Sequence, residues 1–156
     1  MFRGRGKNLE GFVFSTLCAA ILEISANGAA AAQSSPEGLW RTFDDRTGEA
    51  RALVRIYRQD DALFGRVEAS LVPGEGDEHC VACTDERKDQ PVIGLLIIRD
   101  LKAEKGGFSG GDILDPDTGE VYRCTLRLAD DGKRLTVRGY LGVPLLGRSQ
   151  TWQREE

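Results

Sequence analysis

The chain is poor in the residues that carry much of enzyme catalysis. Its 156 residues include a single histidine, His79. An enzyme that needs an imidazole base would have to use it, and it follows an acidic, glycine-rich stretch, 74–78, with no serine nucleophile motif nearby. The net charge is −4 and Lys and Arg form no cluster, so nucleic acid and anionic membrane surfaces are poorly matched partners. We predict a protein that is not an enzyme and needs no cofactor.

The first 32 residues have the composition of a secretory signal peptide. A basic start, a mostly apolar run and a stretch of small residues follow one another at 3–7, 12–22 and 28–32. The apolar run is too short to span a bilayer, and the small residues before Gln33 suit signal peptidase. The sequence therefore predicts cleavage after Ala32, a mature chain 33–156 with no membrane span, and a periplasmic or secreted location. An N-terminal membrane anchor that is not removed is the alternative.

Residues 33–156 form one predicted all-β domain. Alternating apolar and polar residues between turn signals indicate eight strands, at 38–43, 51–58, 63–71, 92–98, 108–114, 120–128, 134–141 and 147–153. Short turns join most of them, and a long polar loop, 73–90, joins the third to the fourth. The stretch 92–98 is continuously apolar, which predicts a strand covered on both faces. The pattern favours an eight-stranded antiparallel up-and-down barrel, which leaves no sheet edge exposed. A two-sheet sandwich is the alternative.

Six motifs occur together over nearly all of the mature chain. They are Gly38-x-Trp40, Cys80-x-x-Cys83, Gly110-Gly111-x-Ile113-Leu114-Asp115-Pro116, Tyr122-x-Cys124, Asp131-Gly132-x-x-Leu135-x-Val137-Arg138-Gly139-Tyr140 and Gly147-Arg148-x-Gln150-Thr151-Trp152. Together they resemble the bacterial exported family of unknown function DUF2147. That family carries no established activity, so the resemblance implies export rather than a particular reaction.

A second, looser resemblance concerns the two ends of the predicted domain. Gly38-x-Trp40 on the first strand, with an arginine on the last, is similar to the lipocalin and calycin pattern. In those barrels the Trp plugs the floor and the Arg lies across its ring, a cation–π contact that ties the last strand to the first. The resemblance implies a lipocalin-like barrel in which Trp40 is a structural plug and Arg148 or Arg154 is its partner.

The mature chain contains three cysteines, at 80, 83 and 124. In an oxidising compartment one disulfide is expected, and three pairings are possible. Cys80–Cys83 needs no long-range geometry and would stiffen the long loop, while Cys124 lies on an apolar strand face and behaves as a small buried hydrophobe. A metal or thiol site built from the cysteines and His79 is a weaker alternative, because adjacent residues bind one tetrahedral centre awkwardly. We predict no metal.

Polar residues that share a strand face are the candidate ligand contacts. Arg138 and Tyr140 share one face of their strand, and Tyr57 shares a face with Arg55. If these faces point inward, Tyr57, Arg138 and Tyr140 could hold a carboxylate or phosphate of a ligand. We favour the outward orientation, since small cores prefer the apolar set. The predicted function is non-enzymatic binding of a small apolar or amphipathic molecule. The alternative is a solidly packed interaction module that makes its contacts through the 73–90 loop.

Overall fold

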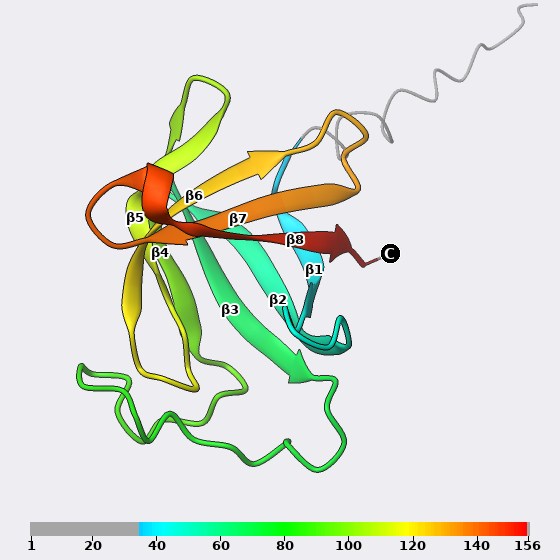
Figure 1. Ribbon diagram of the computed structural model, residues 1–156, viewed down its shortest axis with the longest axis vertical. Helices are drawn as coiled ribbons and strands as arrows, with labels where there is room; N and C mark the ends of the chain where they lie inside the picture. The colour runs from blue at the N-terminus through cyan, green and yellow to red at the C-terminus, as the bar shows by residue number, and fades with distance from the viewer. Residues whose placement is uncertain (1–34, 156) are drawn as a thin grey trace, which may run out of the picture.

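The computed structural model describes residues 35–155, which form a closed antiparallel barrel (Figure 1). Its strands are β1 (Gly38–Phe43), β2 (Ala50–Gln59), β3 (Ala62–Ser70), β4 (Leu96–Glu104), β5 (Gly107–Leu114), β6 (Val121–Leu128), β7 (Arg134–Tyr140) and β8 (Arg148–Arg154). Each pairs with its neighbour in sequence, and β8 returns to β1 through the pair Trp40–Arg154. The predicted eight-stranded up-and-down barrel is confirmed. The predicted signal peptide, 1–32, lies outside the described residues.

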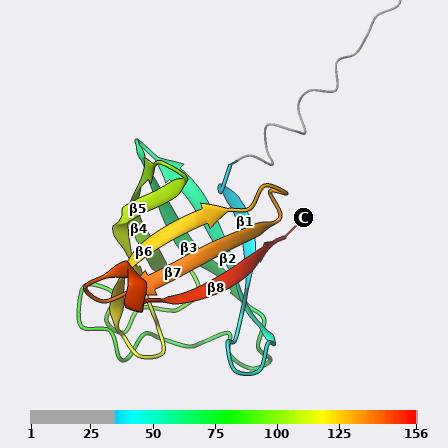
Figure 2. The same cartoon turned by 45° about the horizontal axis from the view of Figure 1, so that its top comes forward.

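Four connections gather at one end of the barrel, which we call the mouth (Figure 2). They are the β1–β2 turn (44–49), the β3–β4 loop (71–95), the β5–β6 turn (115–120) and the β7–β8 loop (141–147). In the two turns, Asp44 and Asp115 accept hydrogen bonds from backbone N–H groups two residues on, at 2.9 and 3.0 Å. Gly119 closes the second turn with a φ of 72°, and a Cβ there would lie 2.1 Å from the Ala82 carbonyl oxygen. The glycine therefore lets the β3–β4 loop pack against the turn.

The barrel interior is apolar because alternate residues of each strand point inward. On β6, Cys124 and Leu126 are buried while Arg123 and Arg127 are exposed, so Cys124 lies on the apolar face, as predicted. The same alternation fills the core from the other strands, with Val54, Ile56, Leu63, Val67, Ile98, Leu101, Leu135, Val137 and Trp152. The polar face carrying Arg138 consequently points outward.

The fourth strand differs most from its prediction. β4 covers Leu96–Glu104 rather than 92–98, so the first part of the apolar run belongs to the β3–β4 loop. Gly94 has a φ of 90° and its N–H donates to the Val67 carbonyl at 2.8 Å, while the Val67 N–H donates to the Leu95 carbonyl at 3.0 Å. The chain thus turns against β3 before the strand begins. The run is apolar because both loop and strand residues pack on the core, not because one strand is covered on both faces.

The only helix between residues 35 and 155 is η1 (Pro144–Leu146), a single 3-10 turn in the β7–β8 loop. This part of the chain therefore contains no helix with the length and apolarity needed to cross a membrane.

Trp40 closes the barrel end opposite the mouth. Its side chain is fully buried, and its indole N–H donates to the Pro36 carbonyl oxygen at 2.8 Å. The Arg154 guanidinium lies over the ring, 4.3 Å from its centroid, and donates to the carbonyls of Ser35, Glu37 and Gly132 at 2.6–2.9 Å. This one side chain ties β8 to the N-terminal segment and to the β6–β7 turn. Trp40 and Arg154 thus form a sealed floor.

Arg148, the other predicted partner of Trp40, lies at the mouth. Its guanidinium pairs with Asp45 at 2.5 Å, and its side chain is largely exposed. Gly38 explains why Arg154 can reach the floor, since a Cβ at this position would lie 2.6 Å from the Arg154 Nη1 atom. The Gly-x-Trp motif therefore supplies both the plug and the space for its partner.

Candidate functional site

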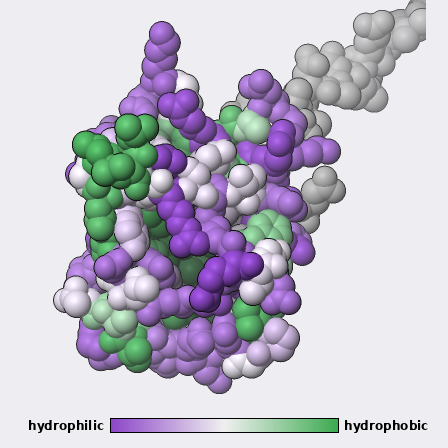
Figure 3. Space-filling view, viewed as in Figure 1, coloured by the Kyte–Doolittle hydropathy of each residue, from purple (hydrophilic) through white to green (hydrophobic). Residues whose placement is uncertain are grey.

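A cavity of about 930 Å³ occupies the mouth half of the barrel. Its deeper walls are apolar and come from six strands: Val54, Val67, Ile97, Ile113, Leu114, Val137 and Trp152. Trp40 is not among the lining residues, so the floor lies below the cavity. The space-filling view shows the opening as a hollow with hydrophilic side chains around it (Figure 3). The interior of this barrel is therefore only partly filled by its own side chains.

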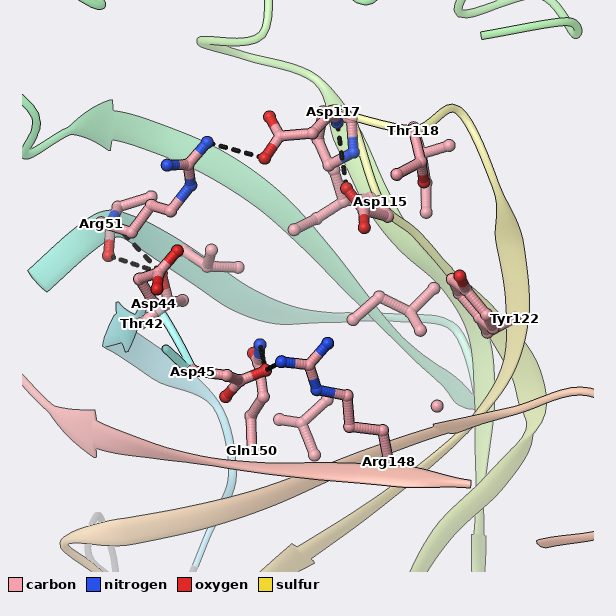
Figure 4. Close-up of a pocket in the computed structure, with 18 of the residues that line it drawn as sticks. Thr42, Asp44, Asp45, Arg51, Asp115, Asp117, Thr118, Tyr122, Arg148 and Gln150 are labelled. Atoms are coloured by element: carbon pink, nitrogen blue, oxygen red, sulfur yellow. Dashed lines mark hydrogen bonds and ion pairs between the residues drawn. The ribbon is translucent and has the colours of Figure 1, made fainter. Parts of the chain in front are cut away.

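Two ion pairs join different elements around the opening (Figure 4). Arg51 of β2 reaches Asp117 of the β5–β6 turn at 2.7 Å, and Arg148 of β8 reaches Asp45 of the β1–β2 turn at 2.5 Å. In each pair at least one of the two side chains is largely exposed to solvent, so each pair adds little to folding stability. Their effect is to place fixed positive and negative charges around an apolar interior.

A chain of hydrogen bonds connects the cavity wall to this charged rim. The indole N–H of Trp152 donates to the Gln150 amide oxygen at 3.0 Å, and the Gln150 amide N–H donates to Asp45 at 2.9 Å. The Asp45 carboxylate also pairs with Arg148. These bonds satisfy the polar atom of a nearly buried tryptophan, which would otherwise cost free energy at the cavity wall.

Tyr122 is a cavity residue that the sequence prediction did not single out as a ligand contact. It lies on the inner face of β6, and its hydroxyl donates to the Glu120 carboxylate. This hydrogen bond is the main reason that the Tyr122 pKa rises to about 12. Tyr122 is two residues from Cys124, so strand alternation places both on the same apolar face. A tyrosine hydroxyl on the inward face of a strand is the feature from which the sequence could have identified Tyr122 as a ligand contact.

The three predicted ligand contacts lie in different surroundings. Tyr57 is on the outer face of β2, stacked on Phe64 with ring centroids 6.0 Å apart. Arg138 is on the outer face of β7, where it binds the β7–β8 loop. Neither lines the cavity, whereas Tyr140 does so at its rim. Of the three, the structure brings only Tyr140 to the opening.

The cysteines are divided between a loop disulfide and a buried thiol. Cys80 and Cys83 form a disulfide in the β3–β4 loop, with Cα atoms 5.4 Å apart. Cys124 is a free thiol inside the barrel, and burial raises its pKa to about 12. His79 is exposed, with Nδ1 3.0 Å from the Asp77 carbonyl oxygen. Within residues 35–155, no three His, Cys, Asp or Glu side chains converge as a metal site would require.

The cavity thus offers contacts for binding. Of the described residues that line it, none is a His or a Cys. The backbone N–H groups of Thr47 and Arg46 hold the pKa of Asp44 below its usual range, which keeps this rim carboxylate charged. A molecule inside would meet apolar walls, the two phenols of Tyr122 and Tyr140, and a charged rim. This arrangement suits an apolar body with a polar end.

The model of a bacterial family described as "Uncharacterized protein conserved in bacteria (DUF2147)" matches residues 38–154. No curated protein matches the chain. Among solved structures, the chain resembles protein HP1028 from the human pathogen Helicobacter pylori, which is described as belonging to the lipocalin family. The TM-score is 0.68 at 18% sequence identity, with 78% of this chain and 84% of the other covered. At this identity the likeness establishes the lipocalin-like fold.

Proposed function

We propose that this chain, which belongs to the bacterial family DUF2147, binds a small apolar or amphipathic molecule inside its barrel. The cavity carries this proposal. Its volume of about 930 Å³ lies in the range of small-molecule pockets, about 300–1,000 Å³. The apolar walls accept the hydrocarbon part of the ligand, and the rim around Arg51 and Arg148 meets its polar end. A solidly packed interaction module would not leave this space.

The protein performs this task outside the cytoplasm and without catalysis. Residues 1–32 direct export as a cleaved signal peptide, and residues 33–156 are the mature protein. The Cys80–Cys83 disulfide supports this location, since such bonds persist mainly in oxidising compartments. The lipocalin-like fold supports a binding role, although folds host many functions and the cavity is the stronger argument.

Native mass spectrometry of the protein recovered from a periplasmic fraction tests the proposal directly. We expect a mature mass starting at Gln33, with one disulfide and an adduct of small-molecule size. After the bound molecule has been removed, a titration with dansyl-labelled undecanoic acid measures binding to the ligand-free protein. Gly139→Leu directs a side chain towards Tyr122 and Ile113, which line the cavity. This variant should bind the probe at least about ten-fold more weakly, the equivalent of one lost apolar contact.

Tyr57→Ala is the matched control, because it shortens a side chain on the outer face of the same barrel. We expect its probe affinity to equal that of the wild type. A bare polypeptide mass together with no probe binding would refute the carrier function. Equal affinities for the wild type and a folded Gly139→Leu protein would refute the cavity as the site.

A further inference from the structure

Three hydrogen-bond donors of the cavity wall are already bound to protein acceptors. The indole N–H of Trp152 donates to Gln150, and the Gln150 amide donates to Asp45. The Tyr122 hydroxyl donates to the carboxylate of Glu120. All three donors belong to residues that line the cavity. A ligand whose polar end is only an acceptor, such as a carboxylate, would have to compete for these donors.

The two arginines at the opening are also engaged. Arg51 pairs with Asp117 at 2.7 Å, and Arg148 pairs with Asp45 at 2.5 Å, so a carboxylate balances each of these positive charges. The third arginine that lines the cavity, Arg46, lies in the exposed β1–β2 turn. An anionic ligand would therefore compete with a protein carboxylate for either of the paired arginines.

The charge left over at the opening is negative. Six carboxylates and three arginines line the cavity. Beyond the two ion pairs there remain Asp44, Glu75, Glu78 and Asp115, and none of these four joins an ion pair within the described part of the chain. Asp44 and Asp115 are half-buried and come from two different turns (Figure 4). An opening lined by an excess of one charge attracts ligands of the opposite charge.

The turns hold two of these carboxylates in place and leave one oxygen of each available. Asp44 accepts the N–H groups of Thr47 and Arg46 through Oδ1, both at 2.9 Å, and Asp115 accepts the Asp117 N–H through Oδ1 at 3.0 Å. The backbone bonds from Thr47 and Arg46 hold the Asp44 pKa below its usual range, so the group stays charged. An ammonium N–H that reached the second oxygen would form a charge-assisted hydrogen bond, roughly twice as strong as a neutral one.

We propose that the cavity selects amphiphiles whose polar end is an ammonium group, and that the unpaired carboxylates of the rim, chiefly Asp44 and Asp115, accept its hydrogen bonds. This inference rests on the proposed function, in which the apolar walls receive the hydrocarbon part of the ligand. Glu75 and Glu78 of the β3–β4 loop add to the negative potential that attracts the cation. Selection by charge is a separate property, because apolar walls alone accept a chain with any polar end.

Three dansyl probes that differ only in their end group test the selectivity: labelled undecylamine, undecanol and undecanoic acid. Fluorescence titration of the ligand-free mature protein at low salt should give the amine a Kd at least about ten-fold below that of the acid, with the alcohol between them. Salt at about 1 M should narrow this difference, because it screens the charges of the rim.

The alcohol separates failure of the selectivity from failure of the cavity as a binding site. If the alcohol binds and the acid binds as tightly as the amine, selection by charge is refuted while binding in the cavity stands. If none of the three probes binds, the proposed function fails and the selectivity fails with it.

Asp44→Asn with Asp115→Asn removes two rim charges but keeps the side-chain oxygens that accept the turn hydrogen bonds. The amine affinity should fall about ten-fold, as expected for the loss of hydrogen bonds to charged groups, and the alcohol affinity should not change. Asp60→Asn with Glu104→Gln is the matched control, since it removes two charges from exposed residues outside the cavity lining. We expect the control to bind all three probes as the wild type does.

The comparison of these two double variants decides whether the rim carboxylates make the selection. An equal loss of amine binding in both would assign the effect to the net charge of the protein and overturn the role of the rim. Wild-type amine affinity in the rim variant would overturn it as well. Equal losses of amine and alcohol affinity in the rim variant would show that the turns matter for their shape, which also contradicts selection by charge.

Discussion

Trp40, Arg154 and Gly38 act as one unit at the floor of the barrel. The indole ring fills the closed end, the guanidinium covers it at 4.3 Å, and the missing Cβ of Gly38 leaves room for the arginine. The pKa of Arg154 is lowered by burial, but a guanidinium stays protonated at any pH at which the protein folds. The charge is compensated by hydrogen bonds to three backbone carbonyls.

Trp40→Ala should lower the free energy of unfolding by about 3–5 kcal/mol, as truncations of large buried aromatic residues do. The variant loses the packed ring and leaves the Arg154 guanidinium over a void. Urea denaturation of the mature protein measures the change. Leu39→Ala, on the opposite face of the same strand, should cost much less. Unchanged stability in Trp40→Ala would show that the floor does not hold the barrel together.

The sequence locates the floor tryptophan but not its partner. Arg148 and Arg154 are six residues apart on one strand, so the alternation places them on the same face. Only their positions along the barrel axis, at the mouth and at the floor, distinguish them. For the same reason the inner face of β6 is predictable, whereas the cavity beside Tyr122 is not. Empty volume depends on how the side chains of several strands meet, which no single strand pattern encodes.

At the scale of elements, the β3–β4 loop is held at several points. The Cys80–Cys83 disulfide lies in its middle. The side chain of Arg87, also in the loop, is buried and donates to Asp85 at 2.5 Å and to the Leu96 carbonyl at 3.1 Å. Arg99 of β4 extends this network to Asp112 of β5 at 3.2 Å. The sequence predicts a long loop here because its residues are polar. It does not predict that the polar residues pair with one another.

The Asp85–Arg87 pair should make stability depend on acid. The hydrogen bond from Arg87 is the chief reason that the Asp85 pKa falls to about 2, from 3.8 for an unperturbed aspartate. The folded state therefore favours the carboxylate. Its contribution is present above about pH 4 and is lost as the pH falls towards 2. Thermal unfolding from pH 5 to 2 should show a steeper loss of Tm in the wild type than in Asp85→Asn. Equal slopes would contradict this assignment.

For the molecule as a whole, closure matters more than any single strand. β8 pairs with both β7 and β1, so it covers the two strands that would otherwise present bare edges. It also brings Arg154 to the floor and Trp152 to the cavity wall. Tight turns and strand alternation predict this closed arrangement well, because every strand pairs with its neighbour in sequence.

Ending the chain after Gly147 should therefore abolish the fold. The truncated protein would expose the edges of β1 and β7, which are templates for association with other chains. Size-exclusion chromatography should show aggregates, and far-ultraviolet circular dichroism should lose the native signal. The mature chain 33–156 is the control. A monomeric truncated protein with the native spectrum would show that seven strands suffice.

The sealed floor has a kinetic consequence for anything held inside. Trp40 and Arg154 close one end, so a molecule in the cavity leaves by the route through which it arrived. A second molecule cannot enter through the floor and displace the first, so it binds only after the first has dissociated. Exchange of one cargo for another is then limited by the departure of the first, at a rate that does not rise with the concentration of the second. The residence time of a bound molecule is therefore set by its dissociation through the mouth.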